Sequence, residues 1–159
     1  MICPATSADV PTLLALIREL AAYEHLESAC VATEDLLRQH LFGSTPAASA
    51  LMILADTPDH APVGYALYFT TFSTFLARPG IFLEDIYVQP AHRNRGFGRS
   101  VFRYLAAICR DQNLGRLEWS VLNWNAPSIA FYQSLGATVL REWQMMRLAD
   151  EALQDLSAN

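Results

Sequence analysis

The chain has few cysteines, and none of them is spaced to hold a metal ion. Cys3, Cys30 and Cys109 are odd in number and far apart in the sequence. Because no CxxC or Cys/His spacing occurs, nothing in the sequence indicates zinc, and we expect no metal. The pattern is typical of reduced, buried thiols in a cytosolic protein.

An excess of positive charge and a long hydrophobic run are also lacking. Against 16 Asp and Glu there are 11 Lys and Arg, so the formal net charge is −5. This charge argues against a nucleic-acid partner and is compatible with a cationic substrate. The most apolar stretch, VGYALYFTTFSTFLA, contains Thr and Ser and is too short for a membrane helix. No signal peptide is evident, so we expect a cytoplasmic protein without a membrane partner.

What the chain does have is enough apolar sequence for one folded domain over residues 1–159. Hydrophobic residues make up 52% and charged residues 17%, which favours a single core. Hydrophobic periodicity and turn signals predict an α/β fold, a mixed sheet with helices packed on it. We expect strands at 2–4, 50–55, 63–74, 80–88, 116–122 and a closing pair at 137–142 and 143–149. One helix is expected to start near Thr6, and three others to cover residues 34–41, 99–112 and 125–135.

The stretch HRNRGFGRS joins a predicted strand to a predicted helix. Unpaired backbone N–H groups and the helix dipole make such a helix N-terminus a generic anion site. Gly96 and Gly98 allow close approach of a ligand to the backbone, and Arg93, Arg95 and Arg99 add positive charge. A turn that merely carries surface arginines is the alternative.

Two common phosphate-binding motifs do not fit this stretch. The third glycine of the dinucleotide fingerprint is replaced by Val101, and no Gly-Lys-Ser/Thr stretch occurs. The sequence Arg93-Asn-Arg-Gly96-Phe-Gly98 does match Arg-x-x-Gly-x-Gly, and it resembles the GNAT family of acetyl-CoA-dependent N-acetyltransferases. LIRELAAYEHLE, TEDLLRQHLFG, FLEDIYVQPAHRNRGFG and WNAPSIAFYQSLGA further resemble its diamine (spermidine/spermine) N-acetyltransferase branch.

This resemblance implies a GNAT fold with a mixed central sheet, acetyl-CoA as the acetyl donor, and a homodimer. In the family, backbone N–H groups of the loop hold the coenzyme A pyrophosphate, and the preceding strand offers backbone groups to the pantetheine arm. Arg95 either adds to phosphate binding or faces solvent, and Asn125 also suits a helix cap. The resemblance assigns these residues to coenzyme A: Ile86, Tyr87, Val88, Arg93, Asn94, Arg95, Gly96, Phe97, Gly98, Arg99, Asn125, Ala126, Pro127, Ser128 and Tyr132.

Acetyl transfer to an amine requires a base and a proton donor. An aliphatic amine, with a pKa near ~10, must lose a proton, and a departing thiolate benefits from an acid. The resemblance assigns the acid to Tyr132, beside the coenzyme sulfur. Since Tyr132 shares a helix face with Ile129 and Leu135, a core tyrosine with a paired hydroxyl is the alternative.

Two neighbouring acids lie in the strand before the loop. Successive strand residues face opposite sides, so Glu84 and Asp85 do not form one paired-carboxylate site. The resemblance places Glu84 at the amine, as a charge partner and as a base through water, whereas a salt bridge at a strand end is the alternative. We interpret Asp85 as structural.

The resemblance also implies residues that bind the amine: Tyr23, Glu24, Glu118, Trp119 and Ser120. Two separated negative sites suit a diamine, whose second ammonium needs an anchor, and Glu27 adds nearby charge. A solvated helix end is the alternative for Glu24, and a core position for Trp119. An amino-acid substrate such as thialysine would bring an α-carboxylate, for which Arg141 and Arg147 are unplaced candidates.

We therefore expect an enzyme that acetylates the primary amine of a small cationic substrate, a di- or polyamine or a lysine analogue. One alternative is acetylation of a protein N-terminus or lysine. Another is a non-catalytic acyl-CoA-binding module, against which the presence of both Tyr132 and Glu84 argues.

Overall fold

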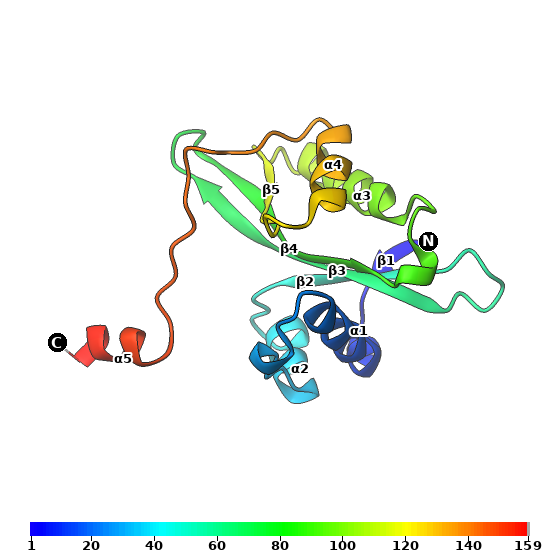
Figure 1. Ribbon diagram of the computed structural model, residues 1–159, viewed down its shortest axis with the longest axis horizontal. Helices are drawn as coiled ribbons and strands as arrows, with labels where there is room; N and C mark the ends of the chain where they lie inside the picture. The colour runs from blue at the N-terminus through cyan, green and yellow to red at the C-terminus, as the bar shows by residue number, and fades with distance from the viewer. Residues whose placement is uncertain (159) are drawn as a thin grey trace. The chain divides into compact units, whose positions relative to one another are not determined.

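A computed structural model describes residues 1–158. The chain forms two compact units, Met1–Ser120 and a second that begins at Val121. The first unit carries a five-stranded sheet in the order β1-β2-β3-β4-β5 (Figure 1). The strands are β1 (Ile2–Pro4), β2 (Ser49–Leu54), β3 (Pro62–Ser73), β4 (Arg78–Val88) and β5 (Leu117–Trp119). Neighbours from β1 to β4 are antiparallel, and β5 is parallel to β4.

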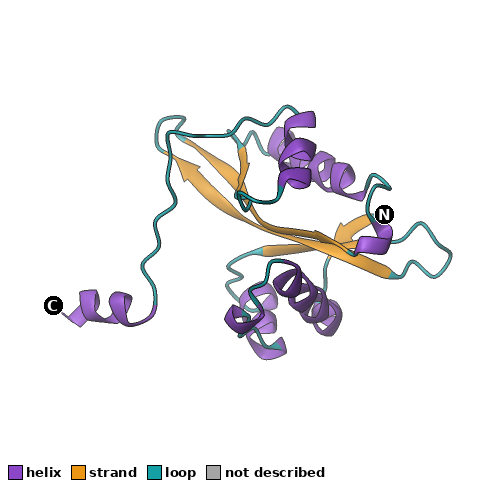
Figure 2. Cartoon of the chain, in the orientation of Figure 1, coloured by secondary structure: helices purple, strands orange, loops and turns teal. Residues whose placement is uncertain are grey.

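Three α-helices of the first unit cover the sheet. They are α1 (Val10–Tyr23), α2 (Glu34–Phe42) and α3 (Phe97–Asp111). Figure 2 shows α1 and α2 on one face and α3 on the other. Three single turns of 3-10 helix stand before or between them: η1 (Ser7–Asp9), η2 (Glu27–Ala29) and η3 (Pro90–His92). The expected mixed α/β architecture is confirmed.

Capping residues mark where the first two helical segments begin: Thr6 caps η1, which runs directly into α1, and Thr33 caps α2. The Asp9 carboxylate accepts hydrogen bonds from the Thr6 N–H at 2.8 Å and the Thr6 hydroxyl at 2.7 Å. At the second helix, Leu36 N–H donates to the Thr33 hydroxyl at 3.3 Å. Each cap satisfies backbone or side-chain donors that the first turn leaves unpaired, so both predicted starts are confirmed.

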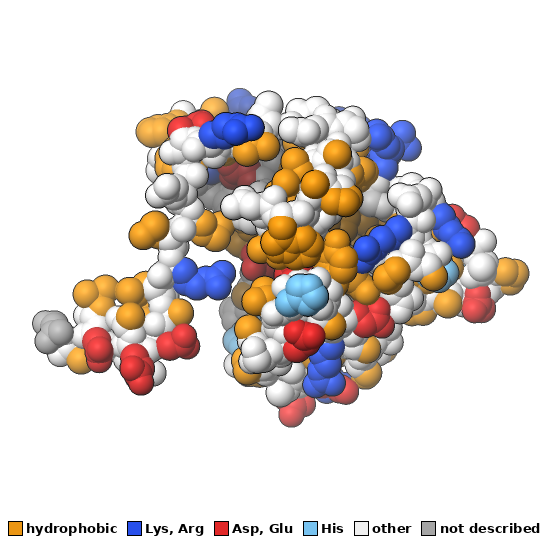
Figure 3. Space-filling model, viewed as in Figure 1, with side chains coloured by type: hydrophobic (Ala, Val, Ile, Leu, Met, Phe, Trp, Pro, Cys, Tyr) orange, Lys and Arg blue, Asp and Glu red, His pale blue; other side chains and the backbone are white. Residues whose placement is uncertain are grey.

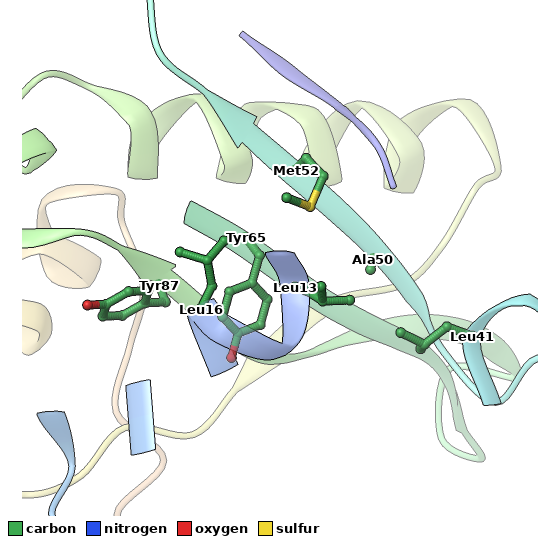
Figure 4. Close-up of a cluster of buried hydrophobic side chains, with 7 residues drawn as sticks. All are labelled: Leu13, Leu16, Leu41, Ala50, Met52, Tyr65 and Tyr87. Carbon is green, nitrogen blue, oxygen red and sulfur yellow. The ribbon is translucent and has the colours of Figure 1, made fainter. Parts of the chain in front are cut away.

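A buried cluster fixes α1 against the middle strands (Figure 4). Leu13 and Leu16 of α1 pack with Met52, Tyr65 and Tyr87, and each of these side chains is at most 5% exposed. Full burial of one such side chain stabilises a fold by about 1.5–3 kcal/mol. The middle of α1 is therefore held against β2, β3 and β4.

Strand β4 has two irregularities before the loop that leads to α3: a β-bulge and an early end to its pairing with β5. Leu67 pairs with Asp85 and Tyr68 with Leu83, so Glu84 is the extra residue of a β-bulge. Within residues 1–158, the β4–β5 ladder covers only Ile81–Leu83 on the β4 side. Beyond Leu83 the two parallel strands no longer pair, which leaves that edge of β4 open.

The second unit contains α4 (Ala126–Ser134) and α5 (Asp150–Ala158). The predicted helix at 125–135 is confirmed, but the closing strand pair at 137–142 and 143–149 is wrong, because those residues have no strand structure. Strand propensity depends on a neighbouring strand to pair with, and these residues pair with none within the described part of the chain. The predicted strand 116–122 is likewise shorter, at three residues.

The cysteines differ slightly from expectation. Cys3, Cys30 and Cys109 are free thiols, as expected, but each is half-buried rather than fully buried.

Candidate functional site

The anion loop, residues Arg93–Arg99, brings the chain from η3 into the N-terminus of α3. Asn94 and Gly96 adopt left-handed backbone angles, with φ of +61° and +84°. Gly96 is the N-cap, so the N–H groups of the first helical turn point outward without helical partners. A Cβ built on Gly96 would meet no atom within 4 Å, so the space beside this backbone is open. These features fit an anion such as a pyrophosphate.

The arginines of the loop have different surroundings. Arg95 and Arg99 are exposed, whereas Arg93 is half-buried. Its Nε donates to the Val88 carbonyl at 2.9 Å, and its guanidinium lies 4.6 Å from the centre of the Tyr23 ring. Arg93 is therefore bound to the protein on two sides, while Arg95 and Arg99 face solvent.

An acidic pair, Glu24 and Asp85, lies on the α1 side of the sheet. Tyr65 is fully buried, and its hydroxyl donates to Asp85 Oδ2 at 2.9 Å. Burial raises the pKa of the Asp85 carboxyl, opposed by the Tyr65 hydrogen bond and reinforced by the Glu84 charge. Burial and the Asp85 charge raise the pKa of Glu24 in turn. The charge of Asp85 thus disfavours ionisation of Glu24, and a cation beside them would relieve this repulsion.

The two adjacent acids of β4 face different environments, as the alternation of strand residues predicts. Glu84 is exposed at the bulge and Asp85 is half-buried. Asp85, which the sequence leads us to interpret as structural, has a raised pKa and accepts the Tyr65 hydrogen bond, and no sequence pattern singles out Tyr65. The available signal was a tyrosine in an aliphatic strand, which needs a hydroxyl partner when buried.

Two other residues that the resemblance assigned to the amine, Glu118 and Trp119, already contact other side chains of the protein. Glu118 forms a 2.7 Å ion pair with Arg116. The Trp119 ring packs edge-on against Phe102 with centroids 4.8 Å apart, which agrees with the core alternative. Ser120 is exposed.

The strand residues predicted to meet the pantetheine arm lie at the open edge of β4. Their partners on β3 are known, since Ala66 pairs with Ile86, Tyr65 with Tyr87 and Gly64 with Val88. The Tyr87 side chain is buried, and its hydroxyl donates to Glu19. These residues combine packed side chains with backbone next to an unpaired strand edge.

The second unit holds the remaining predicted residues. The side chain of Asn125 is buried and accepts a hydrogen bond from Ser128 N–H at 3.3 Å, so the predicted cap of α4 is confirmed. Ala126 and Pro127 are exposed in the first turn. Tyr132 is half-buried, with its ring 5.4 Å from that of Phe131.

Residues 1–158 also bear on metal and membrane partners. No group of three or more His, Cys, Asp or Glu side chains is placed to hold a metal ion. Among these residues there is also no helix of the length and apolar character needed to cross a bilayer. On the face drawn in Figure 3, basic and acidic side chains are interspersed.

Comparison with known proteins gives consistent matches. The family model described as Acetyltransferase (GNAT) family matches residues 15–137. Thialysine N-epsilon-acetyltransferase of Bos taurus is 36% identical over 99% of this chain and 96% of its own length. L-ornithine N5-acetyltransferase NATA1 of Arabidopsis thaliana is 31% identical over 94% of this chain and 84% of its own.

Two further matches extend this set. Spermidine/spermine N(1)-acetyltransferase-like protein 1 of Homo sapiens is 32% identical over 96% of this chain, which spans 23% of that longer protein. A solved integron cassette protein from the mobile metagenome of V. cholerae matches with a TM-score of 0.82 at 23% identity. It covers 100% of this chain and 98% of its own, and it indicates a shared fold.

Proposed function

The chain belongs to the acetyltransferase (GNAT) family, and we propose that it acetylates a primary amine of a small cationic substrate. The substrate class is a di- or polyamine or a lysine analogue, in keeping with the named activities of its relatives. The acetyl donor is acetyl-CoA.

The observation that carries this proposal is the acidic pair. Burial raises the pKa of both carboxyls, and the charge of Asp85 raises the pKa of Glu24 further. Such a pair is unfavourable without a partner charge and favourable beside an ammonium group. A diamine has two ammonium groups, so one can be held here while the other reacts.

Acetyl-CoA supplies the acetyl group as an activated thioester. The anion loop suits its pyrophosphate, because the first N–H groups of α3 lack helical partners, the space beside Gly96 is open, and Arg95 and Arg99 of the same loop are exposed. The open edge of β4 at Ile86–Val88 fits an extended pantetheine arm, which pairs with backbone as an added strand does. Asn125, Ala126, Pro127 and Ser128 complete the proposed coenzyme contacts from the start of α4.

Two residues carry the proton transfers in this proposal. Glu84, exposed at the bulge, accepts a proton from the substrate ammonium through water. The Tyr132 hydroxyl donates a proton to the departing sulfur. Around the amine we propose contacts with Tyr23, Glu24 and, near the end of β5, Glu118, Trp119 and Ser120.

Three broader features belong to the same proposal. Residues 1–159 act as one domain, the protein works in the cytoplasm, and it forms a homodimer. Exposed apolar side chains along the C-terminal segment support an interface with a second copy, and orange atoms gather on that segment in Figure 3. The exposed apolar side chains of this segment include Val139, Leu140, Trp143, Met145, Met146, Leu148, Leu153 and Leu156.

An amine panel tests the proposed function. Thiol release from acetyl-CoA is measured with putrescine, spermidine, lysine, thialysine, a monoamine and a peptide with a free N-terminus. We expect turnover of at least one diamine or lysine analogue well above that of the monoamine and the peptide. Preferred acetylation of the peptide, or release with none of the amines, would contradict the proposal.

A further inference from the structure

We propose that Arg93 is a positioning residue for the amine site, which holds the end of α1 against β4, rather than a ligand of the coenzyme pyrophosphate. The inference rests on the proposed function, because amine kinetics are its main readout. It separates Arg93 from Arg95 and Arg99, although all three belong to the same cationic loop.

The contacts of Arg93 come from protein groups on two elements. Its Nε donates to the backbone carbonyl of Val88 at the end of β4. Its guanidinium lies 4.6 Å from the Tyr23 ring centre and 5.8 Å from that of Tyr87. A planar guanidinium over an aromatic face is an attractive arrangement, and lysine does not reproduce it. Arg93 thus connects the last residue of α1 with β4.

A second layer of polar contacts joins the same two elements. The Tyr87 hydroxyl donates to Glu19 Oε2 at 3.1 Å. Gln89 Nε2 donates to both carboxylate oxygens of Glu19, at 3.1 and 3.2 Å. Glu19 lies one helical turn before Tyr23, so the last turn of α1 is attached to β4 through both residues.

The acidic pair depends on this attachment. Glu24 directly follows Tyr23 at the C-cap of α1. Burial and the charge of Asp85 on β4 raise the pKa of its carboxyl. If the end of α1 were mobile, Glu24 could move away from the like charge of Asp85. The attachment through Arg93 opposes that movement and keeps the pair together for a cation.

Arg95 provides the contrast within the loop. It is exposed, lies directly before the helix N-cap, and forms no ion pair within residues 1–158. Its charge is therefore available to an anion at the N-terminus of α3. Arg93→Met and Arg95→Met remove the same charge from the same loop and form a matched pair.

The decisive experiment compares acetyl-CoA with acetyl-pantetheine, a donor without the pyrophosphate. With either donor, we expect Arg93→Met to raise the KM for the preferred diamine about tenfold. Arg95→Met should raise the KM for acetyl-CoA and leave the diamine KM unchanged with both donors. The inference is overturned if the Arg93→Met defect disappears with acetyl-pantetheine or if it matches that of Arg95→Met.

Hydrogen exchange keeps the inference distinguishable from the proposed function. If the parent protein turns over no amine, the proposed function fails, and the amides of Leu20–Glu24 then decide the role of Arg93. We expect faster exchange there in Arg93→Met but not in Arg95→Met, and equal protection would overturn the inference. Should Arg93→Met fail to fold, Arg93→Lys retains the charge without the planar group and is expected to show the same exchange change.

Discussion

The anion loop and the acidic pair differ in the sign of their charge and in how far their charged groups are exposed to solvent. The loop relies on backbone N–H groups at a helix start, and its outer arginines are exposed to solvent. Both residues of the acidic pair are half-buried, and the pKa of both carboxyls is raised. The exposed loop therefore needs little desolvation to bind an anion. The negative charges of the acidic pair are unfavourable until a cation binds beside them.

This difference indicates where selectivity resides. An exposed anion site accepts any ligand that presents a phosphate, because hydrated charges discriminate little. A half-buried acidic pair disfavours ligands that leave it unpaired and favours those that place an ammonium beside it. Among the following predictions, Gly96→Ala perturbs the loop alone, and Glu24→Gln and Asp85→Asn perturb the acidic pair alone.

The largest expected effect lies outside both binding regions, at the proposed proton donor. Tyr132→Phe should lower kcat about 10²-fold or more, the range of general acid catalysis, without changing the KM for acetyl-CoA. Steady-state kinetics measure both quantities. Tyr104→Phe, at another half-buried tyrosine, is the control and should retain activity. Unchanged turnover in Tyr132→Phe would leave the core alternative for this residue.

A backbone change should weaken the loop alone. Gly96→Ala forces a left-handed residue to carry a Cβ, which costs about 1–2 kcal/mol and shifts the N–H groups. We expect the KM for acetyl-CoA to rise about tenfold, as that cost implies, with little change in the diamine KM. Gly136→Ala is matched, because Gly136 is also left-handed, with φ of +93° and open space around it. It should lower the melting temperature similarly without a change in the acetyl-CoA KM, and an equal rise would remove the distinction.

A charge removal should weaken the acidic pair alone. Glu24→Gln should raise the KM for a diamine several-fold, as loss of a partly buried charge contact implies, and leave a monoamine unaffected. The nearby exposed Glu27, changed to Gln, provides the control for net charge. If the monoamine and diamine KM values rise equally, Glu24 does not anchor a second ammonium.

The smallest expected effect concerns stability. Because the pKa of Asp85 is raised in the folded protein, the native state holds its proton more tightly than the unfolded state does. Its contribution to stability is therefore present at acid pH and is lost as pH rises through the folded pKa. Asp85→Asn should raise the melting temperature at neutral pH, and the gain should vanish at low pH.

Thermal unfolding across pH, with exposed Glu142→Gln as the control, measures this difference. A gain that is independent of pH would show that the substitution acts through packing rather than charge.

Local sequence signals predicted much of the fold. Thr6 with Asp9, Thr33 and Asn125 each cap a helix as expected, because capping depends on residues a few positions apart. The closing strands at 137–149 were wrong for the opposite reason, since a strand depends on a partner elsewhere in the chain.

The candidate site shows the same limit. The motif located the anion loop, but the Tyr65–Asp85 contact depends on the register of β3 and β4 across a bulge, which no local pattern specifies. Arg93 looked like its two neighbouring arginines in sequence. Its position against Tyr23 follows from the packing of α1 on the sheet.

The most direct test of the central claim is the pKa of Asp85, measured by carboxyl NMR with Asp85→Asn for assignment. In the free protein the pKa should lie above the ordinary aspartate value, because the carboxyl is buried near Glu84. Addition of the preferred diamine should lower the pKa of Asp85 clearly, and a monoamine should lower it less. A pKa that a saturating diamine leaves unchanged would contradict the proposal that the acidic pair receives the substrate cation.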